Sequence, residues 1–358
     1  MTARAALAGL AIALVAGLAG GALALALRGD GGERSVVTTI VRGGDAPAFD
    51  PVALYAGARN GVVTIESTFG VDDQTAGSGF VVDAHRGLIV TASHVVTSVD
   101  AGSSTATPAT AVRIVLDDGT RADARVLGYD LFEDTAVLQV DPADLGLRAL
   151  PLGRARSLRV GDSVAVIGSP FENRASLSTG VVSQLDRQIA APGVCFRTTG
   201  VIQTDAAVNP DAKGGLAYAV PIEAVSRAYR ALAAGRRVAY AWLGVSAATV
   251  TPALARALDL SVEHGALVRG LSAGGAAERA GLRVGSDTIE VAGETYPRDG
   301  DVIVAVGSAP VAGFRDLDRA IAGHRAGESV DLHVVRGGDR KSVTVHLLPR
   351  PASFANCS

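Results

Sequence analysis

Short apolar stretches alternate with turn residues at regular spacing from about residue 52 to residue 220. Val, Ile and Leu fill the stretches, and Gly, Asp and Asn separate them, with Asp117, Asp118 and Gly119 forming a hairpin signal. The clearest stretches are residues 62–65, 79–82, 87–90, 112–116 and 164–168. Short strands bounded by turn residues are typical of a β-sandwich or β-barrel. This part of the chain is therefore predicted to be all-β.

The pattern changes to a helical period over residues 221–234. Apolar positions recur at near-helical spacing at Ile222, Val225, Tyr229 and Leu232, and Pro221 stands in the first turn. We expect this helix to close the β region and to join it to a further domain.

The N-terminal residues 5–27 form an uninterrupted run of Ala, Leu, Gly, Ile and Val, with Arg4 before it and Arg28 after it. A bilayer is spanned by about 20 apolar residues. The apolar region of a cleaved signal peptide is shorter, ~7–15 residues. The pattern favours an uncleaved transmembrane helix, with a cleaved signal as the alternative. Residues 28–51 are rich in Gly, Asp, Arg and Pro and are predicted to be a linker whose β-like run is residues 35–41.

Three polar motifs stand at the ends of apolar stretches. His94 ends one stretch, and Asp134 begins another. A third stretch, residues 201–208, runs into a tight loop that begins with Asn209 and Pro210. Such a loop turns several backbone N–H groups toward one point, as an oxyanion hole requires.

Together these motifs resemble the HtrA/Deg family of trypsin-like serine proteases. The family's His motif, its D-x-A-V-L motif and its T-D-A-A-x-N-P motif correspond here to T-A-S-H-V, D-T-A-V-L and T-D-A-A-V-N-P. The order His, Asp, nucleophile loop is the chymotrypsin-type order. The resemblance covers residues 53–349 and implies a mostly β fold, in which a trypsin-like double β-barrel with a truncated second barrel precedes an α+β PDZ domain.

The resulting domain prediction has five parts. Residues 1–27 are a short cytoplasmic tail and the transmembrane anchor, and residues 28–51 are the linker. Residues 52–235 are the trypsin-like protease domain, 236–350 the PDZ domain and 351–358 a tail.

The resemblance gives His94 and Asp134 catalytic roles. His94 takes the proton from the serine and delivers it to the leaving amine, while Asp134 holds the imidazole tautomer and stabilises its cation. Asp130 and Glu133 match the motif less well. The remaining histidines lack a comparable context and are predicted to be surface or strand residues: His85, His264, His324, His333 and His346.

The serine nucleophile of the family is absent from its expected place. Where the family has G-N-S-G-G, this chain has D-A-K-G-G at residues 211–215, and G-L-A-Y-A-V-P follows at once. Two alignments remain open: Lys213 replaces the serine and the next hairpin is deleted, or the motif and the hairpin are both deleted. The second is favoured because residues 215–221 match a later family segment directly. Lys213 does not replace a hydroxyl in acyl transfer, because an acyl-lysine is a stable amide, and a solvated lysine is the favoured interpretation.

Residues 241–348 resemble a PDZ domain of the type that HtrA proteases carry. The resemblance makes Trp242, Leu243, Gly244 and Val245 the loop that binds a peptide carboxylate. It places Leu317 and Ile321 on the helix beside the peptide groove. The alternative for residues 242–245 is a plain apolar strand. Residues 285–300 are an insertion, for which the sequence predicts no function.

Composition excludes some classes of partner and leaves others open. The net charge of −3 at pH 7 argues against nucleic-acid binding. The two cysteines, Cys195 and Cys357, are either one disulfide or two free thiols. We find no metal or cofactor motif, and none is expected.

Three functional hypotheses follow. The resemblance implies a serine endopeptidase of extracytoplasmic protein quality control, acting on unfolded or C-terminal peptide segments, assembled as a trimer or larger, and anchored in the cell membrane by a single helix. Without the serine, we predict that this chain cannot run the acyl-enzyme mechanism. The alternatives are a pseudoprotease that serves as a PDZ peptide-binding scaffold or chaperone, and an active protease whose printed sequence lacks a segment.

Overall fold

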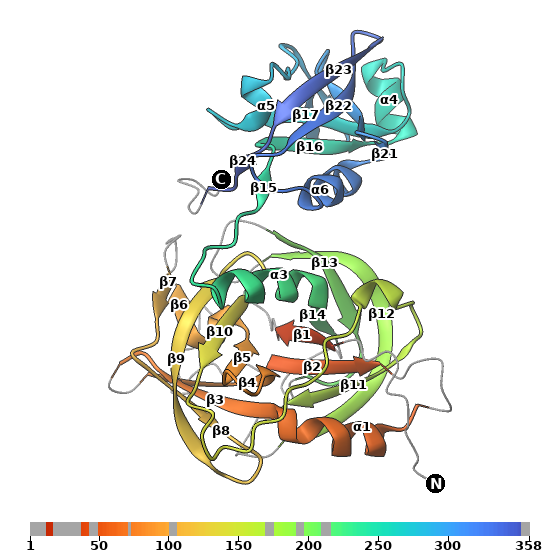
Figure 1. Ribbon diagram of the computed structural model, residues 1–358. Helices are drawn as coiled ribbons and strands as arrows, with labels where there is room; N and C mark the ends of the chain where they lie inside the picture. The colour runs from red at the N-terminus through yellow and green to blue at the C-terminus, as the bar shows by residue number, and fades with distance from the viewer. Residues whose placement is uncertain are drawn as a thin grey trace. The chain divides into compact units, whose positions relative to one another are not determined.

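The structure is a computed structural model that describes residues 12–16, 37–42, 49–70, 73–99, 106–168, 175–190, 197–208 and 216–351. The chain divides into two compact units, with the boundary between Val238 and Ala239. The first unit holds two β-barrels, and the second holds an open sheet with short helices (Figure 1).

The first barrel closes in the strand order β10-β5-β4-β3-β8-β9. Its strands are β3 Val62–Thr68, β4 Gln74–Asp83, β5 Leu88–Thr91, β8 Ala111–Val115, β9 Arg121–Asp130 and β10 Thr135–Gln139. β-Branched residues dominate several of these strands, which suits a pleated surface packed on both sides. The interior is fully covered at Ile65, Phe80, Ile89, Ile114 and Leu138, each 0% exposed. This confirms that the region is mostly β, but the all-β prediction is wrong at its start, where α1 Pro51–Ala58 is a helix that begins at a proline and is capped by Asp50.

The second barrel closes in the order β1-β14-β13-β12-β11-β2. Its strands are β1 Ile12–Ala16, β2 Val37–Arg42, β11 Ser163–Gly168, β12 Ser176–Ala190, β13 Arg197–Thr204 and β14 Ala217–Val220. The sequence predicts a barrel that lacks two strands. The structure differs because β1 and β2 occupy two places in the closed barrel: β1 pairs with β14, and β2 pairs with β11.

Short helices and one small hairpin complete the first unit. They are α1 Pro51–Ala58, α2 Ser93–Val96 and α3 Ile222–Leu232, the 3₁₀ turns Arg59–Gly61 and Ala155–Ser157, and the strand pair β6 Thr97–Val99 and β7 Ala106–Pro108. The predicted helix at residues 221–234 is confirmed as α3. It packs against β9 and β10 through buried side chains, including Val225 and Leu232. At the helix surface, Arg227 forms an ion pair with Glu133, which precedes Asp134.

The second unit is built on a sheet in the order β16-β17-β20-β22-β23, with β21 paired to β20. The strands are β16 Val245–Val250, β17 Gly265–Leu271, β20 Val302–Val306, β21 Ala309–Pro310, β22 Ser329–Arg336 and β23 Asp339–His346, and β15 Ala241–Trp242 pairs with β24 Leu348–Pro349. The helices are α4 Pro252–Leu258, α5 Ala276–Arg279 and α6 Phe314–Ala322. Alternating residues of β22 are buried, because one face of the strand packs on the core.

The insertion at residues 285–300 forms a hairpin of β18 Thr288–Val291 and β19 Glu294–Pro297. Both turn residues have positive φ, 53° at Ala292 and 82° at Gly293, as a two-residue hairpin turn requires. Arg269 on β17 holds the hairpin: its guanidinium donates to the Glu294 carboxylate and to the Thr295 carbonyl, and lies 5.0 Å from the centre of the Tyr296 ring. The hairpin's apolar residues pack against a cluster that is separate from the main core of the unit. The cluster comprises Val250, Leu254, Ala255, Leu258, Leu267, Val302 and Val335.

The predicted transmembrane helix lies mostly outside the described residues. The part of it that is described, Ile12–Ala16, is the strand β1. Elsewhere in the described ranges, no helix has the length and apolar character needed to cross a bilayer. Cys195 and Cys357 also lie outside the described residues, so their pairing stays a prediction.

Candidate functional site

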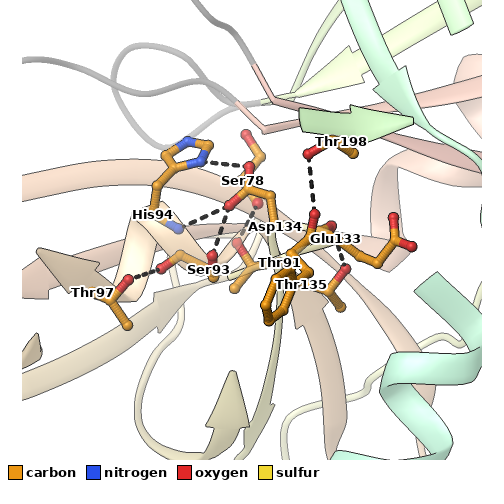
Figure 2. Close-up of polar contacts among 10 residues, drawn as sticks. Ser78, Thr91, Ser93, His94, Thr97, Glu133, Asp134, Thr135 and Thr198 are labelled. Atoms are coloured by element: carbon orange, nitrogen blue, oxygen red, sulfur yellow. Dashed lines mark hydrogen bonds and ion pairs between the residues drawn. The ribbon is translucent and has the colours of Figure 1, made fainter. Parts of the chain in front are cut away.

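The topology of the first barrel brings His94 and Asp134 together. β5 and β10 are antiparallel neighbours, with Thr91 opposite Ala136, so residues after β5 lie beside residues before β10. His94 is on α2, which follows β5 after one residue. Its Nδ1 lies 2.7 Å from Asp134 Oδ2 (Figure 2). The imidazole side chain is 20% exposed and the carboxylate side chain 9% exposed, so the pair is largely shielded from water.

The loop between β9 and β10 holds Asp134 in an uncommon conformation. Its φ of 44° lies in the left-handed region, which aspartate tolerates better than most residues. Asp130 shapes the loop because its carboxylate accepts the N–H groups of Phe132 and Glu133. Thr198, on β13 of the second barrel, donates to the Phe132 carbonyl at 3.0 Å. The structure thus makes Asp130 a loop-shaping residue, in keeping with its weaker motif match.

Electrostatics tie the two side chains together. Burial alone lowers the pKa of His94, but the charge of Asp134 and its hydrogen bond outweigh burial, so the pKa lies above its ordinary 6.5. Burial likewise raises the pKa of Asp134, but the charge of His94 and the hydrogen bonds from His94 and Ser93 outweigh it, so the pKa lies below its ordinary 3.8. The geometry favours an ion pair or a strongly polarised hydrogen bond.

Ser93 is a site residue that the motif analysis does not single out. Its hydroxyl donates to Asp134 Oδ1 at 2.8 Å, and the backbone N–H of His94 donates to the same oxygen at 3.1 Å. The available signal was a small polar residue directly before the histidine, at the end of an apolar strand.

The structure describes the histidine and the aspartate of the site, but not the segment in which the family carries its nucleophile. His94 Nε2, the atom that faces a nucleophile in a Ser-His-Asp arrangement, is buried and has no hydrogen-bond partner among the described residues. The D-A-K-G-G segment with Lys213 lies outside the described residues. The other histidines lie at the surface of their units: His85, His264, His333 and His346 are exposed, and His324 is half-buried.

In the second unit, the predicted carboxylate loop and the predicted helix share one core. Leu243, Leu317 and Ile321 are 4%, 1% and 6% exposed and belong to the same buried cluster. Trp242 and Val245 are half-buried at its margin. The loop between β15 and β16 therefore lies next to α6, as a PDZ peptide groove requires.

The backbone of this loop is tightly packed around Gly244. Gly244 has φ 76°, and a Cβ there would lie 3.2 Å from Gly275 Cα and 3.3 Å from the Trp242 ring. The carbonyls of Leu243 and Gly244 accept the N–H groups of Ala277 and Ser272. For the N–H groups of Leu243 and Gly244 themselves, no acceptor is found within the described ranges.

Two barrels with a histidine and an aspartate joined at 2.7 Å, followed by a PDZ-type unit, define the class of trypsin-like peptidases with a peptide-binding domain. Comparison with known families agrees: the trypsin-like peptidase domain matches residues 77–219, and the PDZ domain matches residues 242–347. The chain belongs to the HtrA family of trypsin-like serine proteases with a C-terminal PDZ domain.

Curated relatives come from bacteria and a plant. The chain is 30% identical to the putative serine protease HhoA of Synechocystis, over 75% of this chain and 69% of that protein. It is 31% identical to the chloroplastic Protease Do-like 1 of Arabidopsis thaliana, over 78% and 64%. It is 30% identical to a probable periplasmic serine endoprotease DegP-like of Ectopseudomonas mendocina, over 77% of this chain and 57% of that protein. The chain thus spans less than two thirds of the last two relatives.

Among solved structures, the HtrA-type protease AlgW with a tripeptide is similar at a TM-score of 0.68 and 25% identity. The similarity covers 85% of this chain and 98% of that one. A serine endoprotease from Yersinia pestis shares the fold at a TM-score of 0.57 and 20% identity.

Proposed function

We propose that the protein is an extracytoplasmic HtrA-type protein of protein quality control that captures the C-termini of unfolded polypeptides with its PDZ domain. We further propose that the chain as printed forms no acyl-enzyme. The observation that carries the second point is the absence of G-N-S-G-G from the sequence, where D-A-K-G-G stands instead. A lone His-Asp pair has no hydroxyl to activate, and loss of the nucleophile removes most of the rate enhancement of a serine protease.

The test is an intact mass of the protein purified from its native cells, with and without a fluorophosphonate probe. We expect the mass of the printed chain, allowing for cleavage of a signal, and no probe adduct, because the probe reacts with an activated serine. A protein of this mass that takes up one probe would refute the proposal.

The second candidate is an active serine endopeptidase whose printed sequence lacks a segment. The observation that favours this candidate is the intact geometry of His94 and Asp134. Substitutions that disrupt the pair would not be selected against if it had no remaining role. In that case the purified protein is heavier than the printed chain and carries one probe. His94 and Asp134 are then the base and the orienting acid of a working triad.

Attachment to the membrane belongs to the same proposal. The apolar run of residues 5–27 supports it, and the strand β1 within that run offers a competing placement, since Ile12–Ala16 cannot cross a bilayer as a helix and complete a barrel together. In the preparation for the mass measurement, an anchored chain stays in the membrane pellet after alkaline carbonate. A chain held only in the barrel is released. Assembly into a trimer, which the family resemblance implies, is checked by light scattering of the same sample.

Peptide capture is supported by the edge of the second unit's sheet. β16 is the end strand of the sheet, and a peptide that adds to such an edge gains main-chain hydrogen bonds. The Thr249 hydroxyl on β16 accepts the N–H of Phe314 at the start of α6, at 3.1 Å. This hydrogen bond joins the strand and the helix that would flank a bound peptide. The N–H groups of Leu243 and Gly244, which have no acceptor among the residues that the structure describes, would then bind the peptide carboxylate.

Replacing Gly244 by valine is expected to weaken peptide binding about tenfold or more. A β-branched residue at φ 76° costs roughly 1–2 kcal/mol, and the new side chain presses on Trp242, so the loop N–H groups turn away from the carboxylate. Trp242 is the single tryptophan of the chain, and its fluorescence reports the titration with a short peptide.

Two controls accompany this titration. Gly327→Val places the same side chain at φ 89° with no atom within 4 Å, outside the groove, and should leave the affinity unchanged. The same peptide with an amidated C-terminus should bind neither protein. Equal peptide affinity of Gly244→Val and wild type would show that this loop is not part of the peptide site.

A further inference from the structure

The hydrogen bonds that hold the Asp134 carboxylate are divided between its two oxygens. Oδ1 accepts the Ser93 hydroxyl at 2.8 Å and the His94 backbone N–H at 3.1 Å, while Oδ2 faces His94 Nδ1 at 2.7 Å (Figure 2). A carboxylate rotates easily about its terminal bond, since that torsion has a broad, roughly two-fold profile. Two donors on Oδ1 fix the plane of the group, and that plane directs Oδ2 at the imidazole.

Ser93 makes this contact at a point in the chain where serine more often bonds locally. It begins the short helix α2, and serine at such a position commonly satisfies its own backbone. Here the hydroxyl instead reaches a residue 41 positions along the chain. Its side chain is buried, at 2% exposure, so water does not compete for it.

The neighbourhood fixes Ser93 in turn. Thr97, 4% exposed, donates its hydroxyl to the Ser93 carbonyl at 2.8 Å and so closes the turn that carries Ser93 and His94. Every donor to the Asp134 carboxylate within the described residues belongs to the segment Ser93–Val96. The orientation of the carboxylate thus depends on donors from α2, while the Thr198 contact from the second barrel supports the loop that carries Asp134.

We infer that Ser93 is a positioning residue of the His94–Asp134 pair, which orients the carboxylate and keeps it ionised. This inference rests on the proposed function, which derives the pair from the family's Ser-His-Asp arrangement. It adds that the described donors to the carboxylate all lie on α2, whatever stands at the nucleophile position. A hydrogen bond to a charged group is stronger than one between neutral groups, so the Ser93 hydroxyl stabilises the anionic form of Asp134 in particular.

The test is an NMR titration of the full-length protein with ring-¹⁵N histidine. The chain has six histidines, and the His94 signals are identified by their loss in His94→Gln. The two groups titrate as a coupled pair with a lower and an upper step. In Ser93→Ala we expect the acid dissociation constant of the lower step to fall about tenfold, the order expected for losing one hydrogen bond to a charged group. The Nδ1 proton of His94 should also lose its downfield shift as the carboxylate gains freedom.

Two variants distinguish a positioning role of Ser93 from a general effect on packing around α2. Ser93→Thr keeps the hydroxyl and should restore the lower step. Thr97→Val removes a buried hydroxyl one turn away that bonds the Ser93 carbonyl and not Asp134, and it should leave the lower step in place. A lower step in Ser93→Ala equal to that of wild type, or an equal change in Thr97→Val, overturns the inference. Because the readout needs no turnover, it stands apart from the probe experiment on the proposed function.

Discussion

Asp301→Ala is expected to destabilise the second unit by about 3–5 kcal/mol, the range for breaking a buried ion pair from one side. Asp301 is 0% exposed, and its carboxylate accepts the Arg336 guanidinium at 2.6 and 2.7 Å and the Arg283 N–H at 2.8 Å. The variant leaves Arg336, 17% exposed, with an uncompensated charge. Since domains are stable by only about 5–15 kcal/mol, this loss is a large share of the total.

Urea unfolding followed by Trp242 fluorescence checks this prediction, because the tryptophan lies in the second unit and reports on that unit. Glu294→Ala is the matched control. It breaks the Arg269–Glu294 ion pair of the same unit, whose side chains are 37% and 60% exposed, and such surface pairs contribute ~0–1 kcal/mol. A similar loss of unfolding free energy in the two variants would show that the buried Asp301–Arg336 pair contributes no more to stability than an exposed pair.

Asp134→Asn is expected to move the pKa of His94 from above its ordinary value to below it. In the wild type, the Asp134 charge and hydrogen bond outweigh burial. The amide removes the charge, so burial remains as the dominant effect and disfavours the imidazolium. The asparagine NH₂ also faces Nδ1 and places the proton of the neutral ring on Nε2, the wrong tautomer for a base. In any form of the protein that carries a serine nucleophile, turnover should fall about 10⁴-fold, as in other triads.

The histidine NMR titration measures this reversal directly. Asp123→Asn is the control, because Asp123 is on the same barrel, is 90% exposed, and pairs with Arg113 far along the sheet from α2. It should leave the His94 titration unchanged. A His94 pKa that stays raised in Asp134→Asn would show that another group sets it.

The same pair gives a pH dependence of stability. The raised pKa of His94 stabilises the fold below pH 6.5, and this contribution disappears as pH rises through the folded-state pKa. The lowered pKa of Asp134 stabilises the fold above pH 3.8, and this contribution disappears as pH falls through its folded-state pKa. The stability difference between wild type and Asp134→Asn should therefore be largest between pH 3.8 and 6.5 and should shrink on both sides.

Sequence reasoning located the pieces of the site that motifs carry. The T-A-S-H-V and D-T-A-V-L motifs single out His94 and Asp134 through the family resemblance, and the pairing of β5 with β10 brings the two side chains to 2.7 Å. It missed Ser93, since a serine beside a histidine carries no distinctive spacing, and its partner is 41 residues away. The left-handed conformation of Asp134 was equally invisible, because it depends on tertiary contacts such as Thr198 with Phe132.

The composition of the second barrel was the largest difference in the fold. Length and hydropathy predict a membrane span for the apolar run of residues 5–27, but these properties do not distinguish a membrane environment from a strand of a β-barrel. Residues 35–41, noted as β-like inside the linker, overlap the strand β2 Val37–Arg42. The local pattern thus predicts the strand, while its pairing with β11, in which Arg42 lies opposite Val164, is a long-range contact that local pattern does not reveal.

The hairpin β18–β19 limits how far the second unit can be shortened. Its Ile289, Val291 and Tyr296 side chains pack on an apolar cluster on α4 and the sheet that includes Val250 and Leu258. Deleting the hairpin would expose this apolar surface and favour aggregation. A shorter form of the second unit would therefore also need polar residues in place of this apolar cluster.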